Sequence, residues 1–187
     1  VDDNQKTAEL YGIYAQDEWK ASKDLVVNYG ARFDISNGYF REQQFSPRLK
    51  AVYSLSENAK LHLGYSRYFT PPPLELVSIK DIAAFQGTTN QQQSNTNQNV
   101  KSESDDWYDA GITYSFTPAL QMGLDGYYKD AKHLLDEGQF GSALLYTPFN
   151  YREGKIYGTE LTVNYRKDDF SAYFNLARQV ASVREAI

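Results

Sequence analysis

The chain has 187 residues, within the range of one domain, and its 10 Phe, 16 Tyr and 2 Trp make it unusually aromatic for a soluble domain. A net charge of -5 argues against a nucleic-acid-binding surface, and the absence of cysteine excludes disulfides and thiolate metal sites. No stretch approaches the roughly 18 consecutive apolar residues of a membrane-spanning helix, which excludes a helical membrane protein but not a membrane β-barrel, whose strands hide apolarity in alternation.

Apolar and polar residues alternate along four segments of the first half, which predicts four β-strands at residues 10–20, 25–34, 46–54 and 60–69. The second of them is the clearest. One face is apolar and the other polar: Leu25, Val27, Tyr29, Ala31 and Phe33 oppose Val26, Asn28, Gly30, Arg32 and Asp34. In the first segment only Asp17 interrupts the apolar face.

The second half repeats this pattern and predicts four more strands at residues 107–116, 120–129, 157–166 and 170–176. Aromatic residues lie near the ends of many apolar faces, as in the girdles of membrane barrels. The opposite faces mix Gly, Asn and charged residues, as a hydrated lumen requires. A soluble antiparallel sheet is the alternative, since its buried face would be equally apolar.

The connections between these strands alternate in length. Tight turns are expected at residues 21–24, 56–59, 117–119 and 167–169, and long connections at residues 35–45, 70–106 and 130–155. Short turns on one rim and long loops on the other are typical of an outer-membrane barrel, with the short turns in the periplasm. The sequence therefore predicts an all-β, antiparallel transmembrane barrel.

The direction of the strands bears on how much of a barrel is present. A bacterial barrel keeps both termini in the periplasm, whereas the first strand here enters a short turn and therefore descends. We accordingly expect residues 1–187 to be a partial barrel domain, about eight consecutive strands of a larger cylinder.

Several strand motifs carry a resemblance to a known family. The stretch from Gln44 to Leu49, followed by Val52-Tyr53 and the stretch from Leu63 to Pro72, resembles the barrel of TonB-dependent outer-membrane receptors. Other stretches are similar to further strands of that family, in matching order: Tyr14 to Trp19, Tyr29 to Asp34, Tyr108 to Ile112 and Tyr157 to Leu161. The resemblance implies a 22-stranded barrel closed by an N-terminal plug domain.

The resemblance also implies a function and a set of partners. It implies a ligand-gated receptor and transporter in the bacterial outer membrane that takes up a scarce nutrient such as a ferric siderophore, haem, cobalamin or a sugar. The implied partners are membrane lipid and lipopolysaccharide, the plug domain, TonB and the small-molecule ligand. Another outer-membrane barrel, a passive pore or a rim enzyme, is the alternative, and a soluble β ligand-binding domain is the third hypothesis.

A ligand is expected in a shallow extracellular cup where aromatic side chains stack and a few cations or amides fix orientation. The candidates are lumen-facing residues of the upper half and two tyrosines of the third long loop: Arg32, Arg48, Tyr68, Trp107, Tyr127, Lys129, Tyr146 and Tyr151. Each could instead contact only water or the plug. A cup dominated by cations favours an anionic chelate, and one dominated by aromatics leaves haem, cobalamin or a glycan equally possible.

Catalytic, metal and cofactor sites are not expected. His62 is predicted low on the lumen face and His133 in an extracellular loop, and neither has a partner at zinc or triad spacing. The pair Asp105-Asp106 is interpreted as solvated rim charges, although loop carboxylates could also hold Ca²⁺. Adjacent residues of a strand point to opposite faces, which argues against a catalytic dyad.

Overall fold

The structure is a computed structural model that describes residues 7–38, 40–73, 87–88, 100–136, 139–140, 145–146 and 149–186. The described residues contain ten β-strands, with these bounds: β1 Glu9–Lys20, β2 Leu25–Asn37, β3 Arg41–Ser54, β4 Ala59–Thr70, β5 Glu103–Thr117, β6 Leu120–Asp136, β7 Gln139–Phe140, β8 Leu145–Tyr146, β9 Phe149–Lys167 and β10 Phe170–Ala186. None of the described residues forms a helix long and apolar enough to cross a membrane.

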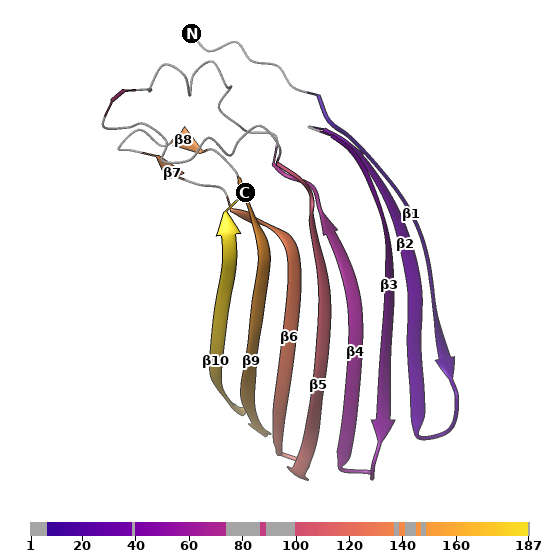
Figure 1. Cartoon of the computed structure of the whole chain (residues 1–187). Coiled ribbons are helices and arrows are strands. Elements are labelled where there is room, and N and C mark those ends of the chain that lie inside the picture. The colour runs from indigo at the N-terminus through magenta and orange to yellow at the C-terminus, as the bar shows by residue number, and fades with distance from the viewer. Residues whose placement is uncertain are drawn as a thin grey trace.

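Eight of these strands form one antiparallel sheet in the order β1-β2-β3-β4-β5-β6-β9-β10, and β7 pairs only with β8. Sequence neighbours therefore lie side by side except where the β7–β8 hairpin is inserted between β6 and β9. Figure 1 shows the sheet as a tall curved wall with the short turns together at its lower rim. The predicted fold class, strand number and all-antiparallel pairing are confirmed.

All four predicted tight turns occur at this lower rim, and hydroxyl side chains close three of them: Ser22, Ser56 and Thr117. Ser22 Oγ accepts hydrogen bonds from the backbone N–H groups of Asp24 and Leu25, at 3.2 and 3.1 Å. Thr117 Oγ1 accepts in the same way from Ala119 N at 3.2 Å and Leu120 N at 3.0 Å. Such hydroxyl contacts replace backbone bonds where a strand reverses.

The opposite rim differs from the prediction, because the strands continue beyond their amphipathic parts. The expected long connection at residues 35–45 is wrong: β2 runs to Asn37, β3 starts at Arg41, and these two residues are partners in the ladder. Likewise β6 continues to Asp136 and β9 already begins at Phe149. Backbone pairing needs no apolar face, so a strand that rises above the lipid loses its alternation without ending.

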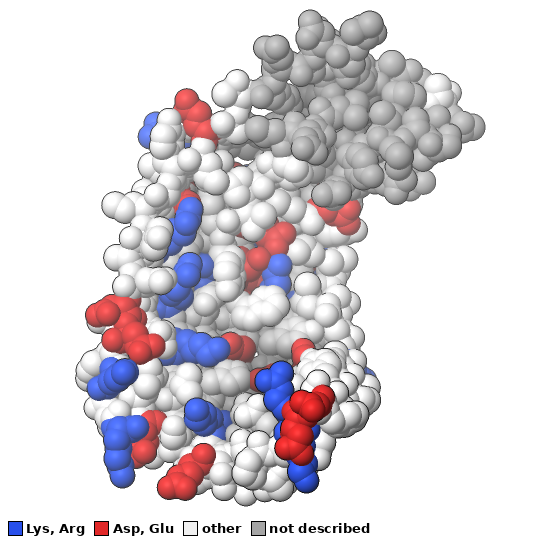
Figure 2. Space-filling model, turned by 180° about the vertical axis from the view of Figure 1, so that it is seen from behind, with Lys and Arg blue, Asp and Glu red and all other residues white. Residues whose placement is uncertain are grey.

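The two faces of the sheet differ as the alternation predicts. We call the polar side the inner face and the apolar side the outer face. Large apolar side chains of the outer face are exposed in this sheet, with Ile13 73%, Leu49 50% and Leu124 53% accessible, whereas the inner-face Asp34 is only 5% accessible. Figure 2 shows a face on which charged side chains are spread over the height of the sheet, as expected of the inner face.

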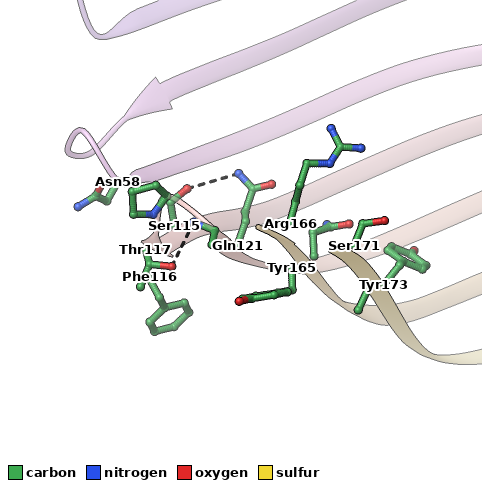
Figure 3. Close-up of a pocket in the computed structure, with 13 residues that line it drawn as sticks. Asn58, Ser115, Phe116, Thr117, Gln121, Tyr165, Arg166, Ser171 and Tyr173 are labelled. Carbon is green, nitrogen blue, oxygen red and sulfur yellow. Dashed lines mark hydrogen bonds between the residues drawn. The ribbon is translucent and has the colours of Figure 1, made fainter. Parts of the chain in front are cut away.

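A close-up of the lower rim shows the same separation between neighbouring residues. Tyr165 and Arg166 are adjacent in β9 and point to opposite sides of the sheet, and Phe116 lies on the side of Tyr165 (Figure 3). These residues border a cavity of about 690 Å³ at the ends of β5, β6, β9 and β10. The outer face is thus aromatic at its lower edge, where a lipid boundary is expected.

Candidate functional site

Six of the predicted binding residues fall in three adjacent cross-strand rows on the inner face. The middle row joins Arg48 to Ser66, Ser66 to Trp107 and Trp107 to Lys129. The row nearer the long-loop rim contains the partners Arg32 and Ser46, and Tyr68 opposite Asp105. The row nearer the short turns contains Tyr127. We call this set the inner band: Arg32, Arg48, Tyr68, Trp107, Tyr127 and Lys129.

The aromatic centre of the inner band is the pair Trp107 and Tyr127. Their rings are stacked, with centroids 5.6 Å apart and an interplanar angle of 5°. Gly158 of β9 makes room for the tyrosine ring, because a Cβ at this position would lie 2.8 Å from Tyr127 Cζ. The Tyr127 hydroxyl donates a hydrogen bond of 3.0 Å to Gln179 Oε1 of β10. The pair is therefore a flat and oriented aromatic surface on the wall.

Two cations of the inner band are neutralised by carboxylates of the same wall. Arg32 Nε donates to both carboxylate oxygens of Asp34, at 2.7 and 2.9 Å. Lys129 Nζ lies 2.7 Å from Glu103 Oε1 and 2.9 Å from Asp105 Oδ2. Arg48 has no such partner among the described residues. The cup is therefore less cationic than the sequence suggests, since Lys129 is already shared by two anions.

The Lys129 cluster lies above the apolar band of the outer face. That band ends at Tyr108 of β5 and Tyr128 of β6, which are partners in the ladder. The next outward-facing pair is Asp106 and Asp130, also partners. Charged residues facing outward are expected only beyond the hydrocarbon layer of a membrane barrel, and Glu103 and Asp105 lie at or beyond this height, on the side of the rim opposite the short turns.

Burial controls the protonation of this cluster. Glu103 is 7% and Asp105 5% accessible. Burial raises the pKa of Asp105 to about 7; the hydrogen bond from Lys129 opposes this rise, and the neighbouring Glu103 adds to it. Burial acts on Glu103 in the same direction, but hydrogen bonds from Lys129 and from Leu135 N hold its pKa below the usual value. The pKa of Lys129 is raised, because both carboxylates outweigh its own burial.

Just before β5, residues 100–102 are fixed to the inner face by two polar side chains. Glu42 of β3 accepts hydrogen bonds from Ser102 N at 2.9 Å and from the Ser102 hydroxyl at 2.5 Å. The Asn150 amide of β9 is bonded to the backbone of Lys101 in both directions, at 2.7 and 3.0 Å. Val100 and Asn150 are almost fully buried. This segment therefore links β3 to β9 across β4, β5 and β6, above the inner band.

Four residues lie elsewhere than the sequence suggests. Tyr151 belongs to β9 rather than to a loop, and by alternation it shares the outer face with Tyr157, packing edge-on against Phe149 at 5.1 Å. His133 lies in β6, not in a loop. Asp105 is buried rather than solvated, because its strand begins four residues earlier than predicted. Tyr146 is in β8, and its side chain lies outside the described residues.

The structure also adds partners that sequence reasoning missed. Glu103 and Asp105 share the inner face with Trp107 because they are four and two residues from it, a spacing that would have identified them had β5 been extended. His62 Nε2 lies 3.3 Å from Asp125 Oδ1 on the inner face. In the described part of the chain, His, Cys, Asp and Glu form no group of three that could hold a metal ion.

A comparison with protein families matches residues 1–184 to the β-barrel of TonB-dependent receptor-like proteins. The chain belongs to this family. The resemblance carried by the strand motifs is therefore confirmed, and the family is one of receptors. No curated protein matches the chain.

Solved structures show the same fold. The siderophore receptor PirA of Pseudomonas aeruginosa is 21% identical with a TM-score of 0.72, over 94% of this chain and 32% of its own. The ferric enterobactin receptor PfeA of the same organism, in complex with enterobactin, is 23% identical with a TM-score of 0.70, over 94% and 27%. The iron transporter FrpB of Neisseria meningitidis is 15% identical with a TM-score of 0.68, over 94% and 26%. The chain thus spans about a quarter to a third of each of these structures.

Proposed function

We propose that this sheet is part of the wall of an outer-membrane receptor that binds a scarce small ligand, such as a ferric siderophore, and imports it with energy from TonB. The inner band carries the proposal: aromatic and cationic side chains from five strands meet on one face, near the extracellular end of the apolar band. Family membership supports it, and so does the similarity of the fold to a siderophore receptor and to an iron transporter. A plug domain, outer-membrane lipid and lipopolysaccharide are the further partners that we propose.

The adjacent tyrosines of β6 provide a test with an internal control. Tyr127 points to the inner face and is stacked on Trp107, whereas Tyr128 points outward toward Tyr108, with ring centroids 6.3 Å apart. In the full-length receptor we expect Trp107→Ala and Tyr127→Ala to weaken binding of ferric enterobactin or a related ferric siderophore about tenfold each, the value of one stacking contact. Tyr128→Ala should leave the affinity unchanged.

Uptake completes the test. Cells that produce the full-length protein should accumulate radioactive iron from the bound siderophore only when TonB is present. Equal loss of affinity in Tyr127→Ala and Tyr128→Ala would show that the inner band is not the binding surface. Uptake that persists without TonB would instead support a passive pore.

A further inference from the structure

A cavity of about 470 Å³ lies across β1 to β4 and reaches from the inner band toward the short-turn rim. Six inner-face side chains line it: Gln16, Glu18, Asn28, Arg48, Lys50 and Ser66. Gln16 and Glu18 come from β1 and Asn28 from β2, while Arg48 and Lys50 follow each other along the inner face of β3. On the face shown in Figure 2, Lys and Arg side chains lie over this part of the sheet, with Asp and Glu side chains among them.

These six side chains make no hydrogen bond or ion pair with one another or with the rest of the described chain. The other two cations of the inner band, in contrast, each form ion pairs. Arg32 is bound by Asp34 and Lys129 by Glu103 and Asp105. The wall therefore neutralises Arg32 and Lys129 but gives Arg48 and Lys50 no ion pair with any described residue.

The spacing of the two basic residues is itself unfavourable. Arg48 and Lys50 are two residues apart in one strand, so they share a face at about 7 Å. Like charges at this distance repel each other unless an anion lies between them. Glu18 does not fill that role, because it pairs with Asn28, which in turn pairs with Lys50, placing it two strands away at about 10 Å.

The remaining side chains suit an anion. The Gln16 and Asn28 amides and the Ser66 hydroxyl can each donate a hydrogen bond, and guanidinium and ammonium groups bind carboxylate and phosphate oxygens strongly. Gly30 keeps Gln16 close to the wall, because a Cβ there would lie 2.8 Å from Gln16 Cβ. Glu18 limits the negative charge that the far end of the cavity tolerates.

We propose that this cavity is an anion subsite, in which Arg48 and Lys50 hold one carboxylate or phosphate group. The inference deepens the proposed function and rests on it for the presence of a lumen on this face. The ligand would then have two separate contact regions on the wall. Its planar groups stack on Trp107 and Tyr127, and one anionic group binds to β3, two strands away from Trp107 of β5. The anion comes from a small ligand or from an acidic side chain of the same protein.

The test uses the full-length protein, with inorganic phosphate as the probe. The double variant Arg48→Gln/Lys50→Gln is compared with Lys132→Gln, an exposed lysine of β6 near the opposite rim. The thermal midpoint is measured in chloride and in phosphate at equal ionic strength. We expect phosphate to raise the midpoint of the wild type and of Lys132→Gln, and the double variant to bind phosphate at least about tenfold more weakly.

The thermal midpoint of the double variant in chloride, compared with that of the wild type, distinguishes the two possible sources of the anion. If an acidic side chain of the protein occupies the subsite, the double variant unfolds at a lower temperature in chloride and phosphate has little effect on the wild type. If the subsite is open to ligand, removing two repelling cations does not lower the midpoint in chloride, and the phosphate effect disappears. A double variant that equals the wild type in chloride and responds equally to phosphate overturns the proposal. This readout needs no siderophore, so it stands apart from the binding test of Tyr127.

Discussion

Asp105 couples the stability of the upper wall to pH. Its carboxyl is buried beside Glu103, and burial raises its pKa from 3.8 to about 7. The folded state therefore holds this proton more tightly than the unfolded state does. The contribution to stability is fully present below about pH 4 and is lost as the pH rises through about 7.

The variant Asp105→Asn removes this dependence. Relative to the variant, the wild type should lose free energy of unfolding between pH 4 and pH 7, by about 1.4 kcal/mol for each unit of pKa difference. Denaturant titrations of the full-length protein in lipid vesicles measure it. Asp169→Asn, in an exposed turn, is the control and should retain the wild-type profile. If the free energy of unfolding of the wild type and of Asp105→Asn depended on pH in the same way, the raised pKa of Asp105 would be contradicted.

Two glycines differ in the space available for a side chain. A Cβ on Gly30 would meet the Ala15 carbonyl oxygen at 2.7 Å, and this backbone atom cannot rotate away, whereas on Gly126 the nearest atoms are 3.9 Å distant. We expect Gly30→Ala to cost about 1–3 kcal/mol through overpacking. Gly126→Ala should change the free energy of unfolding by less than about 0.5 kcal/mol. Equal effects in vesicle unfolding titrations would refute this difference.

At the scale of the strand, the outer face predicts how the wall meets lipid. Leu124 lies in the middle of the apolar face of β6, and Val27 in that of β2. An arginine at a lipid-facing position near mid-bilayer costs about 2–4 kcal/mol, so we expect Leu124→Arg and Val27→Arg to lose this much stability in vesicles. Asn164→Arg on the inner face of β9 serves as the control and should cost less than about 1 kcal/mol. A similar loss for all three variants would contradict the assignment of the faces.

The elements were predictable from sequence only within the lipid-spanning part of the wall. There the outer face must be apolar, so β2 shows strict alternation from Leu25 to Phe33. Above it, Glu103 and Asp105 of β5 face a polar interior and Asp106 faces water, so no contrast between the faces remains. This is why the strand starts were placed too late and why Asp105 was interpreted as a solvated charge.

At the scale of the molecule, the sheet has two free edges. Within the described residues, β1 pairs only with β2, and β10 only with β9. Such edges promote aggregation unless another strand covers them. In the full-length protein, hydrogen exchange should therefore show amides of β1 and β10 protected as well as those of β5. In the isolated 187-residue chain the same amides should exchange quickly or the chain should aggregate. Rapid exchange of both edges in the full-length protein would contradict closure into a larger barrel.

For the candidate site, the sequence predicted which residues share the lumen face. It did not predict which of their cations remain free of an ion pair and can bind a ligand. Strand parity places Arg32, Arg48 and Lys129 on one face, because side chains alternate with a period of two whatever the partners are. Arg32 meets Asp34 two residues along the same strand, whereas the register between strands decides that Lys129 meets two carboxylates of β5 and that Arg48 meets none among the described residues. Parity and the Arg32–Asp34 pair are local properties of the chain, whereas the counter-charges of Lys129 come from another strand.

The alternation of apolar and polar residues by itself determined the strands, their two faces and the short-turn rim. Each of these features depends only on residues that are close together in the sequence. Tertiary structure decided how far the strands extend beyond their amphipathic parts, that Lys129 is neutralised by two carboxylates of β5, and where residues 100–102 cross the inner wall. Those features depend on contacts such as Glu42 with Ser102, which are 60 residues apart in the chain. Only folding brings such residues within hydrogen-bonding distance.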